Sequence, residues 1–225
     1  MADFFRHRLR DAVFGTQDGL VSTLGALTGI AAGTQDGRVV IVAGLVVVAV
    51  EALSMAGGSY LSSKSQRQYL ERMLREERQA IADHPDTERQ EIREMYRARG
   101  YSEPEIEMIA DRLLADPALL LEDMAHKELG ICPATLEQPL GNAAVMGAAY
   151  ITGGLVPVAP YMLLPLGNAM TLSVVTTGLA LLALGIWKGR IVGVSWWRSG
   201  LEVLAIAGLA TAVGFLIGQI VRLML

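Results

Sequence analysis

The chain has 225 residues, of which 52% are hydrophobic, with a mean hydropathy of +0.39 and a net charge of −4. Residues 62–137 hold 17 of the 23 acidic and 11 of the 19 basic residues. Such a partition is rare in a cytosolic globular protein, and it indicates two apolar flanks in lipid with a water-exposed insert between them. The sole cysteine, Cys132, excludes an intrachain disulfide.

Five apolar stretches are long enough to be transmembrane helices, because about 20 residues cross the hydrocarbon of a bilayer. The first is the least hydrophobic, so we expect it to face protein or water rather than lipid. Its Gly25, Gly29 and Gly33 have a small-xxx-small spacing, which predicts close packing against another helix. The expected spans are residues 12–32, 38–61, 139–162, 166–187 and 200–221.

Two carboxylates, Asp18 and Glu51, lie inside these apolar stretches. An ionised carboxylate at membrane depth costs roughly 3 kcal/mol on insertion scales, so such a group is usually kept to bind or move an ion. Met55 follows Glu51 by one helical turn, so the two side chains can face one cavity. We therefore place Asp18, Glu51 and Met55 on a transport path.

The third span ends in a segment that contains Gly153, Gly154, Pro157 and Pro160. The two prolines remove backbone donors, which predicts a break in the helix that neighbours satisfy or that lines a cavity. Tyr150 lies about one turn before the glycine pair, and we place it on the transport path as well.

The basic residues predict the orientation, because loops rich in Lys and Arg stay in the cytoplasm. The N-terminal arm carries three Arg, residues 62–137 carry eleven Lys or Arg, and residues 188–198 carry three. We therefore expect the N-terminus and residues 62–137 in the cytoplasm and the C-terminus on the opposite side. Trp196 and Trp197 are expected as anchors at the membrane interface. The short compact chain suggests the plasma (inner) membrane of a prokaryote.

The polar segment is expected to form a small helical domain between the second and third spans. Asp86 or Thr87 can cap its second helix, and Ser102 its third. The predicted helices cover residues 62–82, from Asp86 or Thr87 to Ala98, 102–114 and 117–129. The expected domains are residues 1–61 with the first two transmembrane helices, 62–137 as a cytoplasmic helical metal-binding domain, and 138–225 with the last three transmembrane helices.

The acids of this domain are arranged for chelation. Glu88 and Glu91 share a helix face, and Glu77 lies just before the preceding turn. Met124 and Glu128 are four residues apart and also share a face. Carboxylates bind hard and borderline cations, and a thioether adds a preference for a transition metal over Ca²⁺ or Mg²⁺. The alternative is a solvated charged helix whose acids pair with Arg at i, i+4.

A second acidic face is formed by Glu103, Glu107 and Asp111. We expect these three side chains to be solvated surface.

Five segments of the chain resemble the motifs of the vacuolar iron transporter (VIT) family. The chain as a whole resembles a prokaryotic-type member of that family. The segments are Arg10–Thr23, which contains Asp-Gly-Leu-Val-Ser-Thr, Ser54–Gln66, Pro85–Glu91, Lys127–Gly130 and Gly153–Tyr161. Each is modest alone, but the order, the five spans and coverage of nearly the whole chain make the resemblance specific.

The resemblance implies a homodimer of five-span protomers with a path between them. It also implies export of Fe²⁺, and often of Mn²⁺, from the cytosol by exchange with protons. The family's functional residues fall on Asp18 as the ion-site aspartate, Asp11 nearer the cytoplasmic entrance, Met55 in the second span, and Glu77, Glu88, Glu91, Met124 and Glu128 as cytoplasmic ligands.

The chain departs from the family pattern in three places. Ser59 stands where the family often has glutamate, and Glu51 is a candidate to take over that role. Ala80 and Ala125 stand where a further glutamate and a second methionine are expected, which implies fewer or weaker ions in the cytoplasmic site.

The leading interpretation is export of divalent transition metal by proton antiport. The alternative is a membrane-anchored metal sensor or storage protein, which needs no intramembrane acids. The expected partners are divalent metal ions, protons, the lipid bilayer and a second copy of the chain, without nucleic acid. No permanently bound cofactor is expected, and no enzyme motif occurs in the sequence.

Overall fold

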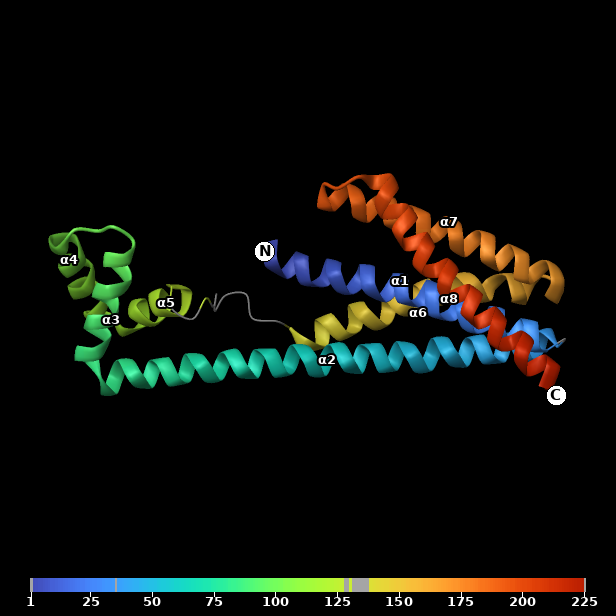
Figure 1. Ribbon diagram of the computed structural model, residues 1–225. Helices are drawn as coiled ribbons and strands as arrows, with labels where there is room; N and C mark the ends of the chain where they lie inside the picture. Colours follow the sequence, from blue (N-terminus) through green and yellow to red (C-terminus); the bar gives the residue numbers. More distant parts are fainter. Residues whose placement is uncertain (1, 35, 128–129, 131–137, 225) are drawn as a thin grey trace. The chain divides into compact units, whose positions relative to one another are not determined.

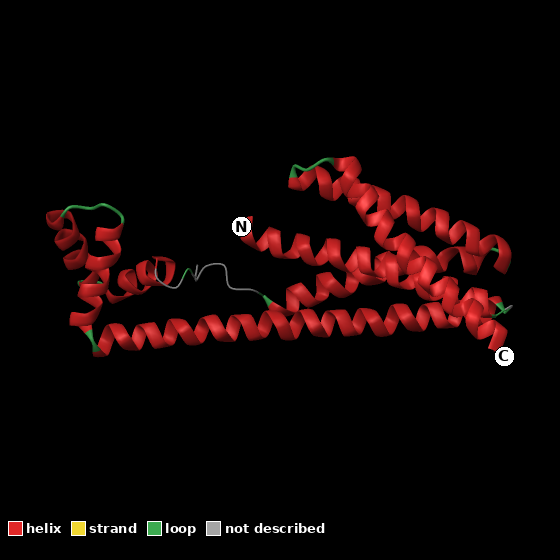
Figure 2. Cartoon of the chain, viewed as in Figure 1, coloured by secondary structure: helices red, strands yellow, loops and turns green. Residues whose placement is uncertain are grey.

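The structure is a computed structural model that describes residues 2–34, 36–127, 130 and 138–224, with the backbone alone for residues 2–7. Every regular element among these residues is an α-helix (Figures 1 and 2). The helices are α1 (Ala2–Gly33), α2 (Gly37–Asp83), α3 (Pro85–Ala98), α4 (Glu103–Leu114), α5 (Pro117–Lys127), α6 (Pro139–Leu163), α7 (Leu166–Val192) and α8 (Trp196–Met224).

Two compact units divide the chain. The first unit combines Met1–Leu61 with Pro139–Leu225, and the second is Ser62–Gln138. Helix α2 contributes to both, because the boundary between Leu61 and Ser62 falls within it. The cytoplasmic location of the second unit stays a prediction.

Helix α1 packs against α6, α7 and α8 within the first unit (Figure 1). Glycine residues allow the backbones of α1 and α6 to approach each other closely. A Cβ added to Gly15 would lie 2.8 Å from the carbonyl oxygen of Met146, and one added to Gly153 would collide with the backbone of Thr16. Larger side chains at these positions would force the two helices apart, so the backbones touch because the residues are small.

The glycine stripe of α1 faces α8. A Cβ added to Gly25 would lie 3.2 Å from the carbonyl oxygen of Ala210, and one added to Gly29 would lie 2.6 Å from that of Gly214. Gly33 continues the stripe on the next turn. The close packing predicted from the spacing is confirmed, and the residues of α8 that face the stripe are also small and have the same spacing.

Four helices are long and apolar enough to cross a membrane, namely α2, α6, α7 and α8. Helix α1, which contains the first expected span, does not reach that hydropathy because it carries Thr, Gln and Asp. A helix that packs mainly on other helices needs less apolar surface than one that faces lipid. The structure therefore supports four of the five expected spans, and the first one, residues 12–32, stays a prediction.

Helix α6 continues through both of its prolines, Pro157 and Pro160, so the predicted break does not occur. The fully buried hydroxyl of Ser173, on α7, donates to the carbonyl oxygen of Pro157 at 2.8 Å. This hydrogen bond ties α6 to α7 beside the two prolines, whereas the carbonyl groups that lose their helical donor are those of Gly153 and Val156, four residues before each proline.

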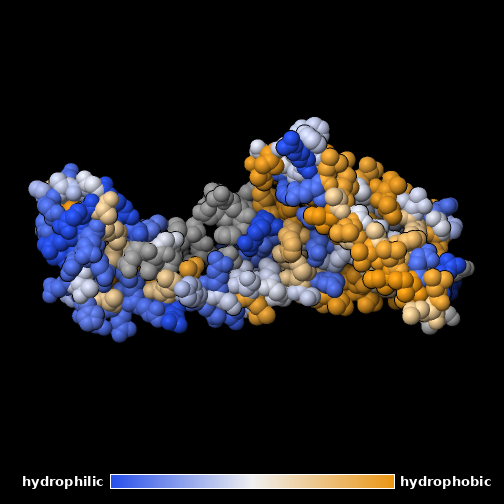
Figure 3. All heavy atoms as spheres, in the orientation of Figure 1, coloured by the Kyte–Doolittle hydropathy of each residue, from blue (hydrophilic) through white to orange (hydrophobic). Residues whose placement is uncertain are grey.

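The surface of the first unit is strongly apolar. In Figure 3 hydrophobic side chains cover the part formed by α7 and α8, whereas hydrophilic ones dominate the part formed by α3 and α4. Leu53 is 76% exposed and Leu209 68% exposed, and many similar side chains surround them. Such a surface suits lipid and not water, as expected for an integral membrane protein.

The second unit has its own small core, formed by apolar side chains of α3, α4 and α5. Ile92, Ile106 and Met124 are completely buried. Tyr96, Ala110, Leu113 and Leu120 complete the cluster.

The caps of these helices match the sequence expectation in one case and not in another. Ser102 caps α4 in a capping box with Glu105, whose carboxylate accepts from the Ser102 amide at 2.8 Å. For α3 the predicted cap, Asp86 or Thr87, is wrong. Pro85 is already the first helical residue and His84 precedes it as the N-cap, because proline has a backbone angle suited to that position.

Candidate functional site

The half-buried Asp18 lies on α1 beside a short chain of hydrogen bonds. The Ser22 hydroxyl donates to the carbonyl oxygen of Asp18 at 2.6 Å, and its oxygen lies 2.6 Å from the hydroxyl oxygen of Tyr150. A serine hydroxyl has one hydrogen, and the carbonyl takes it, so Tyr150 must be the donor to Ser22. The completely buried Tyr150, on α6, is thereby tied to the backbone of α1 at Asp18.

Glu51 approaches this site from α2. Its side chain is exposed in the single chain, yet its charge interacts with Asp18 and with Tyr150. Met55 follows one turn later on α2 and is partly buried. Asp18 and Tyr150, both predicted for the transport path, are thus linked through Ser22, and Glu51 on α2 lies within electrostatic reach of both.

Asp11 lies two helical turns before Asp18 and is only 3% exposed. Its carboxylate accepts a long hydrogen bond of 3.4 Å from the hydroxyl of Ser59, on α2, and an interaction of 3.5 Å from Arg10. Ser59 is the position at which the family pattern often has glutamate. In this chain Asp11 therefore has a hydroxyl beside it where a second carboxylate would repel it.

The predicted cytoplasmic ligands lie in the second unit. Glu88 is 3% exposed and Glu77 9% exposed, and Met124 is completely buried. Glu77 precedes Ile81, a partly buried side chain that packs against the core, by one turn of α2, so its carboxylate is on the core-facing side of that helix. Carboxylates buried to this extent need hydrogen-bond donors or a cation.

The structure says less about the remaining two predicted ligands. Glu91 is partly buried, and Glu128 lies outside the described residues. Among the residues that the structure describes, no three His, Cys, Asp or Glu side chains gather closely enough to hold a metal ion. The metal centre therefore stays a prediction, although the buried donors have the right chemistry for one.

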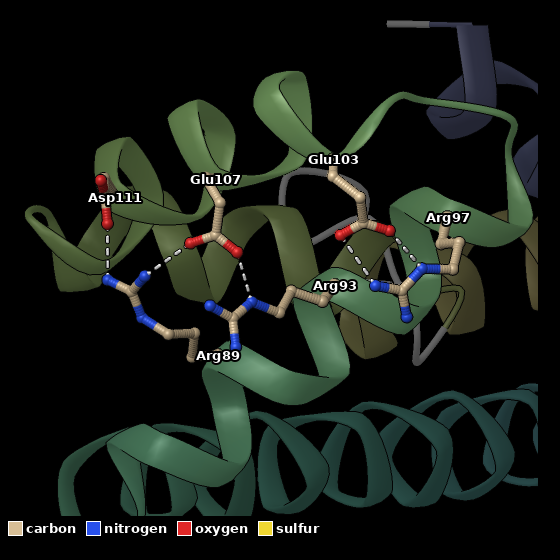
Figure 4. Close-up of polar contacts among 6 residues, drawn as sticks. All are labelled: Arg89, Arg93, Arg97, Glu103, Glu107 and Asp111. Atoms are coloured by element: carbon tan, nitrogen blue, oxygen red, sulfur yellow. Dashed lines mark hydrogen bonds and ion pairs between the residues drawn. The ribbon is translucent and has the colours of Figure 1, made fainter.

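A ladder of ion pairs joins α3 to α4 (Figure 4), made by Arg89, Arg93 and Arg97 with Glu103, Glu107 and Asp111. Arg93 Nε lies 2.6 Å from Glu107 Oε1, and Arg97 binds Glu103 through two nitrogens at 2.7 and 2.9 Å. These hydrogen bonds lower the pKa of Glu107 and of Glu103. The acids are not simply solvated, as the sequence had suggested, because a matching row of arginines pairs with them.

The ladder also bears on the alternative interpretation of the predicted ligands, in which the acids of a solvated helix pair with Arg four residues away on the same helix. The arginines of α3 extend toward α4 (Figure 4), and their ion pairs within the described residues go to that helix. Glu88 lies on another side of α3, one turn before the core residue Ile92. Pairing with arginines of the same helix is therefore not the arrangement that those arginines adopt.

Sequence reasoning missed Ser22, and it noted Ser59 only as the replacement of a glutamate that the family often has. Both are ordinary serines in otherwise apolar or small-residue segments, and each matters only through a partner on another helix. One signal was available for Ser22, because it stands one turn after Asp18 and shares its helix face.

Comparisons with known proteins find similarity along nearly the whole chain. The model of the VIT family matches residues 9–219. Vacuolar iron transporter 2 of Oryza sativa subsp. japonica is 36% identical over 208 residues, which cover 92% of this chain and 85% of that protein. Vacuolar iron transporter 1 of Arabidopsis thaliana is 32% identical over 215 residues, 95% of this chain and 86% of that protein. The vacuolar iron transporter of Toxoplasma gondii (strain ATCC 50861 / VEG) is 25% identical over 225 residues, 96% of this chain and 74% of that protein.

Proposed function

Since the chain belongs to the VIT family, we propose that it exports a divalent transition metal, Fe²⁺ and also Mn²⁺, from the cytosol in exchange for protons. The relatives named vacuolar iron transporters support iron as the cargo. The observation that carries the proposal is the link between Asp18 and Tyr150 through Ser22 on apolar helices, with the carboxylate of Glu51 within electrostatic reach of both.

The two carboxylates supply the exchange. Asp18 and Glu51 repel each other when both are ionised, and a divalent cation between them removes that repulsion. Protons remove it equally well, so the same pair alternates between a metal ion and protons. Met55 adds a thioether one turn from Glu51, which favours Fe²⁺ over Mg²⁺ and Ca²⁺.

Tyr150 positions the backbone of α1 at this site and does not itself bind the metal ion. Its hydroxyl holds the Ser22 oxygen at 2.6 Å, and Ser22 in turn holds the carbonyl oxygen of Asp18. A serine that bonds back onto its own helix tends to bend it. We infer that this chain of bonds sets the course of α1 at Asp18.

A second copy of the chain is proposed to complete the path. Glu51 is exposed on α2 beside the exposed apolar side chains of Val50 and Leu53. A carboxylate on such a face would meet hydrocarbon, which is costly, unless protein covers it. In a homodimer the two copies of Glu51 and Asp18 would line one path between the protomers.

The second unit is proposed to collect the metal in the cytosol. Glu77, Glu88 and Met124 offer two carboxylates and a thioether on its buried side. Glu91 and Glu128 are proposed to complete the ligand set.

The proposed sidedness follows the basic residues, with the N-terminus and residues 62–137 in the cytosol. The relatives are vacuolar by name and lend no support to the plasma membrane of a prokaryote, which rests on the sequence alone.

The test is metal uptake by the purified chain in proteoliposomes, with an imposed pH gradient and with Fe²⁺, Mn²⁺, Mg²⁺ and Ca²⁺ compared. A dye sealed inside reports proton movement in the opposite direction. Asp18→Asn keeps the shape of the side chain but removes its charge and its proton, so transport should cease while the protein stays folded. Asp36→Asn, in the exposed segment between α1 and α2, is the matched control and should transport normally.

Three outcomes would count against the proposal. Metal uptake at the wild-type rate by Asp18→Asn would remove that residue from the path. Uptake that ignores the pH gradient would exclude proton exchange. Tight metal binding without any uptake would favour the sensor or storage protein.

A further inference from the structure

The turn between α7 and α8 concentrates aromatic and basic side chains. It holds all three tryptophans of the chain and three cations within Trp187–Arg198, a segment without an acid. Glu202 is the next acid, one turn of α8 beyond Arg198. The six residues that we call the α7–α8 patch are Trp187, Lys188, Arg190, Trp196, Trp197 and Arg198.

Close helix contacts hold this turn in one geometry. Gly193 ends α7 with a positive φ of 76°, and the Val194 amide donates to the carbonyl oxygen of Gly189 at 3.0 Å. A Cβ added to Gly189 would lie 2.8 Å from the Cα of Trp196, so the end of α7 touches the start of α8. The patch residues at the end of α7 and at the start of α8 are therefore presented together from one end of a fixed helix pair.

The patch faces outward. Trp187, Trp196 and Trp197 are 46%, 52% and 49% exposed. Arg198 places its guanidinium over the ring of Trp197, 5.2 Å from the ring centre, and Arg190 is exposed. Of the ion pairs between described residues, none uses a cation of this patch.

The neighbourhood of the patch in a membrane follows from the helices that carry it. Both α7 and α8 are apolar enough to span a bilayer, so their shared end lies at its polar boundary. Tryptophans collect at that level, where indole sits among the lipid headgroups. The chemical groups that meet the three cations there are headgroup phosphates, which guanidinium and ammonium groups bind as donors.

We propose that the α7–α8 patch is a binding site for the headgroup of an anionic phospholipid. A zwitterionic headgroup brings its own cation, which three clustered positive charges repel, whereas an anionic one brings only the phosphate charge and hydroxyls. The site is separate from the Asp18 region and does not depend on metal transport.

The tryptophans make the test direct, because all the tryptophan fluorescence of the chain comes from the patch. The full chain is reconstituted in phosphatidylcholine vesicles that contain a minor fraction of one brominated lipid. This lipid is either phosphatidylglycerol or phosphatidylcholine, each brominated near the headgroup, and the two are compared at equal fractions. Bromine quenches tryptophan on contact, so lipid enrichment at the patch appears as extra quenching. We expect the brominated anionic lipid to quench more strongly at every fraction.

Charge removal should abolish this preference. Each cation near an anionic surface contributes about 1 kcal/mol, which is about fivefold in local lipid occupancy. The triple variant Lys188→Gln, Arg190→Gln, Arg198→Gln should be quenched equally by the two lipids, and Arg198→Gln alone should lose part of the preference. Arg222→Gln is the matched control, since it removes one arginine from the last turn of the same helix, about 36 Å from Arg198.

Equal quenching of the wild-type chain by the two lipids would overturn the proposal. So would a triple variant that keeps the preference while its helix content is unchanged. An equal loss in Arg222→Gln and Arg198→Gln would show a general charge effect and no site at the patch. If the triple variant fails to fold, Arg198→Gln against Arg198→Lys decides, because lysine keeps the charge and should keep most of the preference.

Discussion

The two units of this chain are built from the same element, the α-helix, but are held together differently. In the first unit α1 meets α6 and α8 through glycines, with backbones in contact, and the outer surface is apolar. In the second unit a small apolar core joins α3, α4 and α5, and a ladder of exposed or partly buried ion pairs runs along α3 and α4.

The difference reflects two solvents. Lipid is as apolar as leucine, so burial does not drive helices together there, and close packing of small residues takes its place. In water the burial of apolar side chains drives association, and charged side chains can remain outside. The comparison predicts that each unit is weakened by a different kind of substitution.

The largest effect is expected in the core of the second unit. Ile92→Ala removes a completely buried side chain and should lower the free energy of unfolding of that unit by about 3 kcal/mol. Hydrogen exchange of the full chain should show lost protection in α3, α4 and α5, with α6 to α8 unchanged. Met108→Ala, at a side chain 71% exposed on α4, is the control and should leave protection intact. A loss that spreads equally to α6–α8 would break the distinction between the units.

Replacing a glycine by a slightly larger residue where helices touch should lower the stability of the first unit. A Cβ at Gly214 would collide with the backbone of Gly25, so Gly214→Ala should cost about 2 kcal/mol of stability. Gly208→Ala on the same helix meets no atom within 4 Å and should change stability by less than about 1 kcal/mol. Thermal unfolding in detergent measures both. Similar unfolding temperatures for the two variants would mean that the glycine contacts do not hold α1 and α8 together.

The hydrogen bond between Tyr150 and Ser22 should contribute less, about 1 kcal/mol. Tyr150→Phe and Ser22→Ala each remove it, and the double variant should lose less stability than the sum of the two single losses. In the proteoliposome assay, both single variants should also slow metal transport if the bond positions Asp18. Strict additivity of the stability losses would show that the two hydroxyls do not interact.

The smallest effect is expected from the ion-pair ladder, because its members are exposed or only partly buried and solvent screens them. The pKa of Glu103 and of Glu107 is lowered in the folded protein, so their contribution is present above the ordinary value of 4.5 and is lost as the pH falls below it. Protection of α3 and α4 against hydrogen exchange, corrected for the intrinsic rate, should therefore fall between pH 5 and pH 3. Glu107→Gln should reduce this pH dependence. An unchanged pH profile in that variant would show that the ladder adds nothing measurable.

Much of the local structure could be predicted from the sequence, because its causes are local. Apolar length identified the helices that contain Glu51 and Tyr150, and Ser102 with Glu105 marked the start of α4. The errors also have local causes. The first helix begins at Ala2 instead of residue 12, because polar residues form helix as readily as apolar ones, and hydropathy does not mark its start.

The residues of the site that come from different helices were beyond such rules. Asp18, Glu51 and Tyr150 could each be singled out as a polar group in an apolar stretch, but their meeting depends on how α1, α2 and α6 pack. The same holds for the glycines of α1, whose spacing predicts a partner helix without saying which one. Spacing along a helix determines which face a side chain shares, and only the packed fold determines what lies opposite that face.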